Sequence, residues 1–433
     1  MITFAIVMLN ISIKRNILTI RGVSILFLCV FILGFFVGEF YPPTSTIGLV
    51  GFVILSIISS IKIKWSFNQL KNPYIISFFV LFLLYLSGLL TTQDGNWGYY
   101  FKRLTLKLPF LLFPLAFTMQ SSLTKANYQL ILKFFLFMMF VTEAGSLINY
   151  MIDFEQVNQL YLQSKIMPVI SNHVRYSLMA CSAVYIAYYL YRESDEKVYL
   201  YLSIFFFFFI HVLAVRSGLL AVYLLVGAYG VYTIIKKRYL ESRLLVLTSV
   251  LMLLLSFFVL PSFQNKLLNT QQDLSHINND DIEEEKKASD FSLVGRKYSY
   301  KVGLELFSNS PILGVGIGNI DAEVTKMYKE EHPMIIKILM PHNQFIRLLA
   351  ESGVVGLLVF LYGFYFFLFR NKNYLKSPVL LMHYGLITIS FLFEGTMETQ
   401  LGFNFTLFFI VLTLSQLGHL SFKKYCSEDV GLS

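Results

Sequence analysis

The stretch VYLYLSIFFFFFIHVLAVRSGLLAVYLLVGAYGVYTII, residues 198–235, decides the fold class of this chain. As a single helix it would be roughly 57 Å long at about 1.5 Å per residue, nearly twice the ~30 Å thickness of a hydrocarbon core. The stretch therefore predicts two membrane-spanning helices. The predicted break between them is Arg216-Ser217-Gly218.

The whole chain has the composition of a membrane protein. Of its 433 residues, 56% are hydrophobic and 14% are charged, and its mean hydropathy is +0.63. A soluble domain carries roughly 25% charged residues. We therefore predict an all-α, polytopic membrane protein of about twelve transmembrane helices, near residues 21–38, 46–61, 74–90, 106–120, 129–150, 173–191, 198–215, 217–235, 243–260, 353–369, 378–395 and 403–420.

The charge and cysteine patterns exclude several functions. The net charge is +9, but the basic residues are scattered between apolar runs and form no stripe that would bind nucleic acid. Cys29, Cys181 and Cys426 show no pairing pattern, so we assign them no disulfide, metal or redox role. No small-residue cleavage site follows Val37, which indicates a retained first span rather than a signal peptide.

The orientation follows from the distribution of Lys and Arg over the connections. Alternate connections are rich in these residues, whereas the short connections between them hold few. The positive-inside rule then places both termini in the cytoplasm and the long loop 261–352 outside. We predict three parts: an N-terminal transmembrane bundle (1–260), this outward loop with the catalytic motifs (261–352), and C-terminal transmembrane helices with a short cytoplasmic tail (353–433).

The outward loop changes character along its length. Its first part, Asn269–Asp290, contains the charge-dense run DDIEEEKK, which predicts a solvated, mobile segment without a site. Apolar residues then recur every fourth position and predict an amphipathic helix that ends before Asn309. A glycine-rich turn at 314–318 and a second short helical stretch follow. His342 is placed at the start of a further helix, for which Gly353 is the expected stop.

Four motifs in this loop occur in a distinctive order. Gly295-Arg296 is followed by PILGVGIGN (311–319), PHNQF (341–345) and AESG (350–353). This order resembles the O-antigen ligase and O-antigen polymerase superfamily, with the match covering roughly 295–356. The resemblance implies a GT-C type membrane glycosyltransferase that moves a glycan from a polyprenyl diphosphate carrier to an acceptor hydroxyl, without a metal ion or other cofactor.

The same resemblance implies a location and partners. The protein would be a multi-pass protein of the cell inner membrane, in contact with membrane lipids, with its large loop in the periplasm. Its acceptor would be a lipid A core, for a ligase, or another lipid-linked glycan, for a polymerase. We favour the ligase as the prediction, although nothing in the loop separates the two.

His342 is the candidate catalytic base, because transfer requires a group that takes the proton of the acceptor hydroxyl. At a helix N-terminus the backbone dipole disfavours imidazolium, which would keep the ring neutral. The alternative is a residue that only caps or packs at the membrane surface. Asn343 and Glu351, within the same motifs, are the candidate supporting residues.

Arginines are the candidate ligands for the departing diphosphate, since a planar guanidinium grips phosphate oxygens bidentately. Arg216 stands between two apolar spans, where an arginine costs about 2.5–3.5 kcal/mol to insert at membrane depth. Arg296 has motif support, and Arg175 begins a span at its outer end. For each of the three, an anchor at the membrane interface is the alternative.

Other charged positions carry weaker predictions. Lys102 and Arg103 either add to an outward basic rim or, as we expect, are surface anchors. Glu394 and Glu398 either line the acceptor entrance or occupy a solvated helix end. No strand precedes the glycine-rich turn, so it is no dinucleotide fingerprint, and His332 with His342 lacks partners at metal-ligand spacing.

A transporter or flippase for a lipid-linked glycan is the alternative from a different class. It would also use outward and intramembrane arginines. Its signature would be matching interrupted helices in two halves of the chain, and no such repeat is present.

Overall fold

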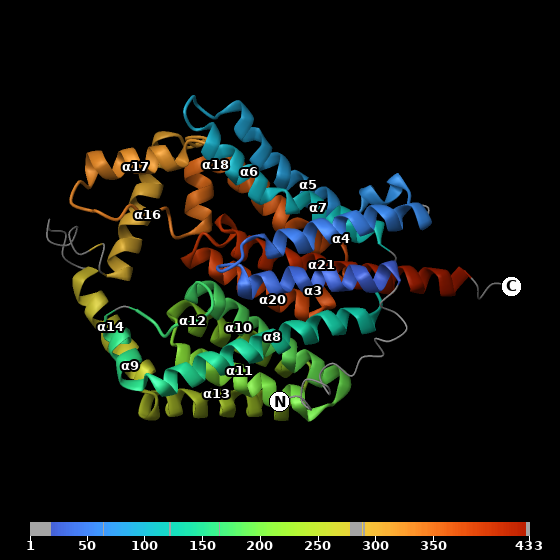
Figure 1. Cartoon of the computed structure of the whole chain (residues 1–433), viewed down its shortest axis with the longest axis horizontal. Helices are drawn as coiled ribbons and strands as arrows, with labels where there is room; N and C mark the ends of the chain where they lie inside the picture. The colour runs from blue at the N-terminus through green and yellow to red at the C-terminus, as the bar shows by residue number, and fades with distance from the viewer. Residues whose placement is uncertain are drawn as a thin grey trace.

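The computed structural model of the chain describes residues 19–63, 65–120, 123–163, 165–277, 288 and 291–429, with side chains as far as residue 418. Throughout this described part the chain forms helices and no strand. The all-α fold class is therefore confirmed. Most helices run along the long axis of the molecule, and a smaller group is gathered at one end (Figure 1).

The bundle joins the two ends of the chain through its core. The ring of Phe31 lies 4.8 Å from that of Phe113 and 5.2 Å from that of Phe408, between centroids. In chain order the helices of this part are α3 (Ile20–Val37), α4 (Pro43–Lys62), α5 (Pro73–Leu86), α6 (Trp97–Lys107), α7 (Pro109–Met119), α8 (Lys125–Ile152), α9 (Phe154–Leu162), α10 (His173–Ser194), α11 (Lys197–Leu213), α12 (Arg216–Ile235), α13 (Tyr239–Val259), α20 (Pro378–Phe393) and α21 (Gln400–Asp429).

Eight helical segments in the described residues are long and apolar enough to cross a membrane. Two shorter apolar helices, α11 and α20, add to them. The chain is thus a multi-pass membrane protein, while the count of about twelve spans and the three-part division stay predictions. The eight segments are Ile20–Val37, Pro43–Lys62, Pro73–Leu90, Lys125–Ile152, Arg216–Ile235, Tyr239–Val259, Gln344–Arg370 and Gln400–Gly418.

The long apolar stretch breaks next to the predicted position. α11 ends at Leu213, and Ala214 adopts a left-handed conformation with φ of 48°. α12 then begins at Arg216. The presence of a break is confirmed, but it lies at Ala214-Val215, directly before the predicted Arg216-Ser217-Gly218, and it places Arg216 at a helix start.

Four helices form the polar end of the molecule (Figure 1). α14 (Pro261–Ile277) packs on α9. α16 (Ser292–Asn309) packs on α18 (Gln344–Leu361), and α17 (Ile320–Glu331) lies between α16 and α18 in the sequence. α16 is the predicted amphipathic helix, and it buries all four of the periodic apolar residues Val294, Tyr298, Val302 and Leu306.

Gly353 ends the first helical segment of α18, as the sequence predicted. Its φ of 64° and ψ of −167° lie outside helical values, and a second helical segment follows directly after this bend. The helix then continues through a π-helical turn, η3 (Tyr362–Phe366), into α19 (Phe367–Arg370). A Cβ atom at Gly353 would lie 2.2 Å from the carbonyl oxygen of Ile312, so only glycine fits this contact.

The glycine-rich turn satisfies the backbone groups that the bend releases. The amides of Val315 and Gly316 donate to the carbonyls of Ala350 and Glu351 at 2.9 and 3.1 Å. The turn is therefore a structural support for α18.

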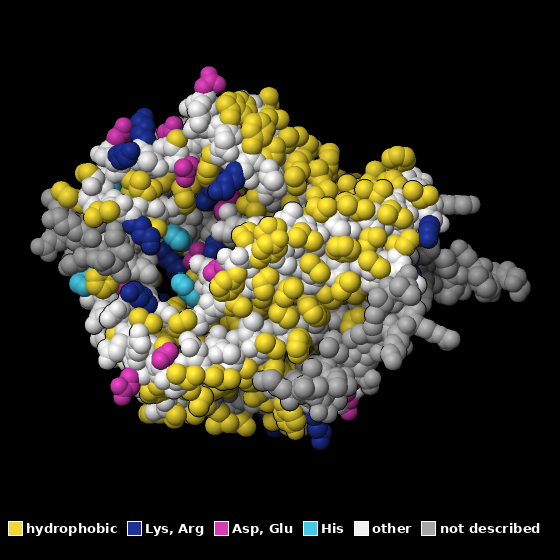
Figure 2. All heavy atoms as spheres, viewed as in Figure 1, with side chains coloured by type: hydrophobic (Ala, Val, Ile, Leu, Met, Phe, Trp, Pro, Cys, Tyr) yellow, Lys and Arg dark blue, Asp and Glu magenta, His cyan; other side chains and the backbone are white. Residues whose placement is uncertain are grey.

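Polar side chains gather where the helices of the polar end meet the bundle. Figure 2 shows hydrophobic side chains over much of the visible bundle face and a hollow, at the end with α16, around which Lys, Arg, His, Asp and Glu side chains collect. This hollow is where a polar site can exist on an otherwise apolar molecule.

The sidedness of the polar end can be measured by cysteine labelling. With the native cysteines replaced, Glu330→Cys on exposed α17 should react with an impermeant thiol reagent in intact spheroplasts, because the Lys and Arg distribution orients the spans. Lys372→Cys, between α19 and α20, should react only after lysis. The reverse pattern would invert the predicted topology.

Candidate active site

His342 lies one residue before Asn343, the N-cap of α18. Its Nδ1 atom is 3.2 Å from Oε2 of Glu394, the residue that directly follows α20. The His342 side chain is 31% exposed, and the Glu394 side chain is 11% exposed. A largely buried carboxylate thus holds one side of an imidazole that remains accessible.

The backbone around His342 is fastened to α16. Its amide donates to Oγ of Ser299 at 3.3 Å, and the hydroxyl of Tyr300 donates to the His342 carbonyl at 3.1 Å. The same hydroxyl lies 3.1 Å from the carbonyl oxygen of Leu392, near the end of α20. α16 and α20 therefore position His342 and its carboxylate partner together.

Asn343 supports His342 through the helix start. Its Oδ1 accepts from the amides of Phe345 and Ile346 at 2.9 and 3.1 Å, and its Nδ2 donates to the carbonyl of Leu392 at 3.1 Å. The side chain therefore caps α18 and ties it to α20. It has a structural role next to the candidate base.

Arg296 binds the same carboxylate as His342. Its Nη2 atom donates to Oε1 of Glu394 at 2.8 Å, so the two carboxylate oxygens take different partners. Burial alone would raise the pKa of Glu394, but the hydrogen bond with His342 and the charges of His342, Arg296 and Arg175 hold it below the usual range. Glu394 is therefore ionised at neutral pH.

Arg175 lies in the first turn of α10, and its charge acts on Glu394. Its Nε atom is buried and bonds to none of the described residues. The side chain lines a cavity of about 200 Å³ together with Glu39 and Gln400. Arg175 therefore belongs to the same electrostatic region, with part of its guanidinium uncommitted.

Arg216 reaches from the start of α12 to α14. Its Nη2 atom donates to Oδ2 of Asp273 at 2.6 Å and to Oδ1 of Asn269 at 3.1 Å. Its Nε and Nη1 atoms donate to the hydroxyls of Thr270 and Ser292 at 2.9 and 3.3 Å. Arg216 is therefore held firmly by protein groups.

These contacts correct one prediction. The stretch Asn269–Asp290 was expected to be solvated and without a site, yet the Asp273 side chain is fully buried against Arg216. The reason is that α14 continues to Ile277, so the first residues of the stretch belong to a packed helix. The charge-dense run itself lies outside the described residues.

Lys266 was not singled out from the sequence. It is buried on α14, and its Nζ donates to Oδ1 of Asn269 at 3.2 Å. Burial and the charge of Arg216 outweigh the opposing effect of Asp273 and lower the Lys266 pKa to about 8. The charge of Arg296 also lowers the pKa of Lys266, so Lys266 lies within electrostatic range of both Arg216 and Arg296.

A second set of charges lies beside the first, and we call it the buried charge network: Arg103, Lys107, Arg347, Glu351 and Glu398. Nη1 of Arg103 is 2.7 Å from Glu351, and its Nη2 is 2.5 Å from Glu398. Nε of Arg347 is 3.6 Å from Glu351, and Nζ of Lys107 is 3.4 Å from Glu398. All five side chains are less than 10% exposed.

The network corrects two further predictions. Arg103 is not a surface anchor, because Glu351 and Glu398 draw it inside the protein, whereas Lys102 next to it is exposed. Glu398 is not at a solvated helix end. Burial would raise its pKa, but the charges of Arg103, Lys107 and Arg347 hold it well below the usual range.

The connection between α20 and α21 joins the network to the site. Glu394 at its start contacts His342, and Glu398 near its end belongs to the network. Gln344 clamps it, since its Nε2 donates to Glu398 at 2.9 Å and its Oε1 accepts from the amide of Met397 at 3.0 Å. Glu351 therefore supports the site indirectly, through Arg103 and this connection, and it does not touch His342.

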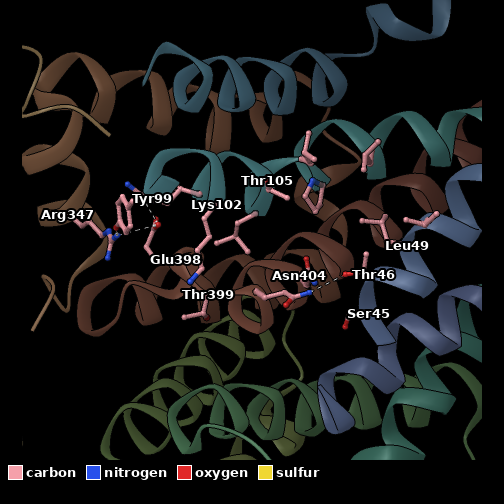
Figure 3. Close-up of a pocket in the computed structure, with 17 residues that line it drawn as sticks. Ser45, Thr46, Leu49, Tyr99, Lys102, Thr105, Arg347, Glu398, Thr399 and Asn404 are labelled. Atoms are coloured by element: carbon pink, nitrogen blue, oxygen red, sulfur yellow. Dashed lines mark hydrogen bonds and ion pairs between the residues drawn. The ribbon is translucent and has the colours of Figure 1, made fainter. Parts of the chain in front are cut away.

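A cavity of about 600 Å³ adjoins the network (Figure 3). Tyr99, Lys102, Arg347 and Glu398 cluster in one part of it, and Leu49 lies in another. The rest of the apolar wall comes from Val50, Leu106, Leu108, Pro109 and Leu112. This combination suits an amphiphilic ligand, with polar groups at the charged end and alkyl groups along the apolar wall.

Residues 201–361 match the family model described as O-antigen ligase. This segment is similar to the O-antigen ligase domain. The resemblance predicted from the loop motifs is thereby confirmed, and the match supports an enzyme of the O-antigen ligase and polymerase superfamily. No curated protein matches the chain.

The matched segment contains Arg216, Lys266, Arg296 and His342. Arg175 lies before the matched segment and Glu394 after it, yet the fold brings Glu394 against His342 and brings Arg175 close enough for its charge to act on Glu394. The candidate site is thus completed by helices α10 and α20, which flank the matched segment in the sequence.

Proposed function

We propose that the protein transfers a glycan from a polyprenyl diphosphate carrier to an acceptor hydroxyl, as an O-antigen ligase, on the outer face of the inner membrane. One observation carries the proposal: within and beside the matched segment, an accessible imidazole, its carboxylate partner and several cations meet at one end of a membrane bundle. Base and cations are the two requirements of this reaction.

His342 supplies the base. When Nδ1–H donates to Glu394, the other ring nitrogen, Nε2, carries a lone pair that accepts a proton. As the acceptor oxygen attacks the anomeric carbon, Nε2 takes its proton. The new glycosidic C–O bond forms while the bond from the anomeric carbon to the diphosphate oxygen breaks, and polyprenyl diphosphate leaves with its electron pair. Glu394 fixes the tautomer and stabilises the imidazolium that results.

The cations receive the charge that builds on the leaving oxygen. A guanidinium has five N–H donors, so Arg296 keeps donors for phosphate beyond the one that Glu394 accepts. Arg175 has an uncommitted Nε. Arg216 and Lys266 add positive charge from the α14 side, with Arg216 held in a fixed orientation by Asp273 and its neighbours.

The proposal is tested with purified protein in nanodiscs, a polyprenyl diphosphate glycan, and either a lipid A core or a second lipid-linked glycan as acceptor. We expect release of polyprenyl diphosphate and a lengthened lipid A core, unchanged by added chelator because the cations are side chains. Product only with the second glycan would make the protein a polymerase. Movement of intact donor across the bilayer, with no product on either acceptor, would contradict the proposal in favour of a flippase.

Lys266 gives the reaction a pH dependence. Its ammonium loses a proton as pH rises through about 8, so its attraction for the diphosphate is present below that pH and lost above it. We expect the donor KM to rise several-fold between pH 7 and 9. Lys266→Arg keeps its charge over this range and should flatten the change. An equally steep rise in Lys266→Arg would show that another group titrates.

A further inference from the structure

A second cavity, of about 350 Å³, lies at the opposite end of three helices that carry the candidate site, and we call it the far-end cavity. α10 has Arg175 in its first turn and Arg192 near its last residue. α12 starts at Arg216 and ends three residues before Arg238, which lines the cavity. α20 runs from Pro378, also in the lining, to the residue before Glu394.

The wall of the far-end cavity is aromatic and apolar. Tyr188 and Tyr189 of α10 face Tyr229 and Tyr232 of α12, and the rings of Tyr188 and Tyr229 pack edge to face at 5.6 Å. Val184, Val226, Leu245, Val379 and Met382 complete the apolar part of the lining. Such a wall accommodates an alkyl chain, and its volume lies in the range of about 300–1,000 Å³ that small-molecule sites occupy.

The mouth of the cavity is basic. Arg192 and Arg238 line both the cavity and an open surface depression that also includes Lys237. A single carboxylate, Glu241, lies between the arginines, 3.3 Å from Nη1 of Arg192 and 3.8 Å from Nη1 of Arg238. Three cations therefore face one carboxylate, and the excess charge favours an anionic ligand.

Glu241 is itself oriented by the aromatic wall. Its Oε1 accepts from the hydroxyls of Tyr188 and Tyr229 at 2.5 and 2.9 Å, which leaves Oε2 toward the arginines. The other acidic residue in the lining, Glu193, pairs with Lys125 of α8. Glu241 thus orients the guanidinium groups of Arg192 and Arg238 at the rim. Each guanidinium has five N–H donors, so donors remain for an anionic ligand.

The neighbouring surface points to lipid as the source of the ligand. α13 exposes most of its apolar side chains, among them Leu240, Leu244, Leu247 and Leu251. Its start forms one side of the depression, and Leu245 lines the cavity. A molecule bound here would therefore have its polar group at the rim and its chain continuous with the bilayer.

We propose that the far-end cavity binds an anionic phospholipid, with the phosphate at Arg192, Lys237 and Arg238 and one acyl chain between the tyrosines of α10 and α12. Basic pockets between membrane helices on the cytoplasmic side bind such headgroups. The basic residues here belong to the set that the positive-inside rule assigns to the cytoplasm. The site is independent of the transfer reaction and would brace the ends of α10 and α12 opposite Arg175 and Arg216.

The test uses the full-length protein in phosphatidylcholine nanodiscs, to which phosphatidylglycerol is added in steps. Binding to the folded state should raise the melting temperature by about 5 °C at saturation. Arg192→Gln with Arg238→Gln should remove this rise. Arg243→Gln, which removes one positive charge from an exposed position on α13 outside both linings, is the control for general surface charge and should keep it.

Two further arms separate the sources of the anion. Val226→Phe keeps the basic rim but fills the cavity, so it should abolish the rise if an acyl chain enters. Inorganic phosphate added to the protein in phosphatidylcholine alone should produce no rise. A rise with phosphate, a rise retained in Val226→Phe, or an equal loss in Arg243→Gln would each overturn the proposal, in favour of a free anion, a purely superficial contact, or general surface charge.

Discussion

Turnover of the His342→Ala variant is expected to fall by about 10² to 10⁴, the usual contribution of a general base. The donor KM should change little, because Arg296 and Arg175, the proposed ligands of the diphosphate, keep their charges in this variant. A loss in kcat with an unchanged KM identifies a group that acts in the transition state rather than in substrate binding.

The carboxylate partner supplies a second measurement. Glu394→Gln keeps the shape of the side chain but removes the charge that stabilises imidazolium, so kcat should also fall, by less than in His342→Ala. His276→Ala, on α14, is the control, since its ring packs on Phe291 and contacts no site residue. Near-normal turnover in His342→Ala would exclude it as the base even if the family assignment stands.

Local sequence signals predicted the helices well because the physics behind them is local. The break before Arg216 follows from the length of an apolar run against the thickness of a bilayer, and α16 follows from apolar side chains four residues apart. The position of His342 at a helix start follows from Phe345, Leu348 and Leu349, which recur at helical spacing after it. None of these predictions needs a partner from elsewhere in the chain.

The partners of the charged residues could not be predicted, because they are distant in the sequence. His342 and Glu394 are 52 residues apart, and Arg103 is 248 residues from Glu351. Taken alone, Arg103 and Glu398 have the pattern of ordinary interface residues. One signal was present: Arg347 and Glu351 are four residues apart, which predicts an ion pair on one helix face, as observed.

Composition misjudged the stretch around Asp273 for a related reason. Averaged over Asn269–Asp290, the charge density is typical of a solvated segment. The start of that stretch, however, completes α14, and Asp273 is fully buried where it neutralises Arg216. A charge density averaged over the whole stretch does not show where a helix ends inside the stretch. The sequence also does not distinguish a buried carboxylate from a solvated one unless the cation that pairs with it is known.

The Arg103→Ala variant should be strongly destabilising. Removing it leaves Glu351 and Glu398, both buried, without their closest cation, and breaking a buried ion pair in this way costs about 3–5 kcal/mol. Lys107 and Arg347 compensate only in part, at 3.4 Å and 3.6 Å. Transfer activity should fall as well, because Glu398 and Gln344 hold the connection that carries Glu394.

Stability is measured as the free energy of unfolding in mixed micelles titrated with denaturing detergent. Lys102→Ala is the matched control, as the adjacent residue with the same charge on an exposed position, and it should change stability by less than about 0.5 kcal/mol. Arg103→Met combined with Glu351→Met should be less destabilising than the sum of the single changes, since neither charge is then left alone. If Arg103→Ala unfolds no more easily than Lys102→Ala, the buried charge network does not hold the α20–α21 connection, and the placement of Glu394 beside His342 must depend on α16 alone.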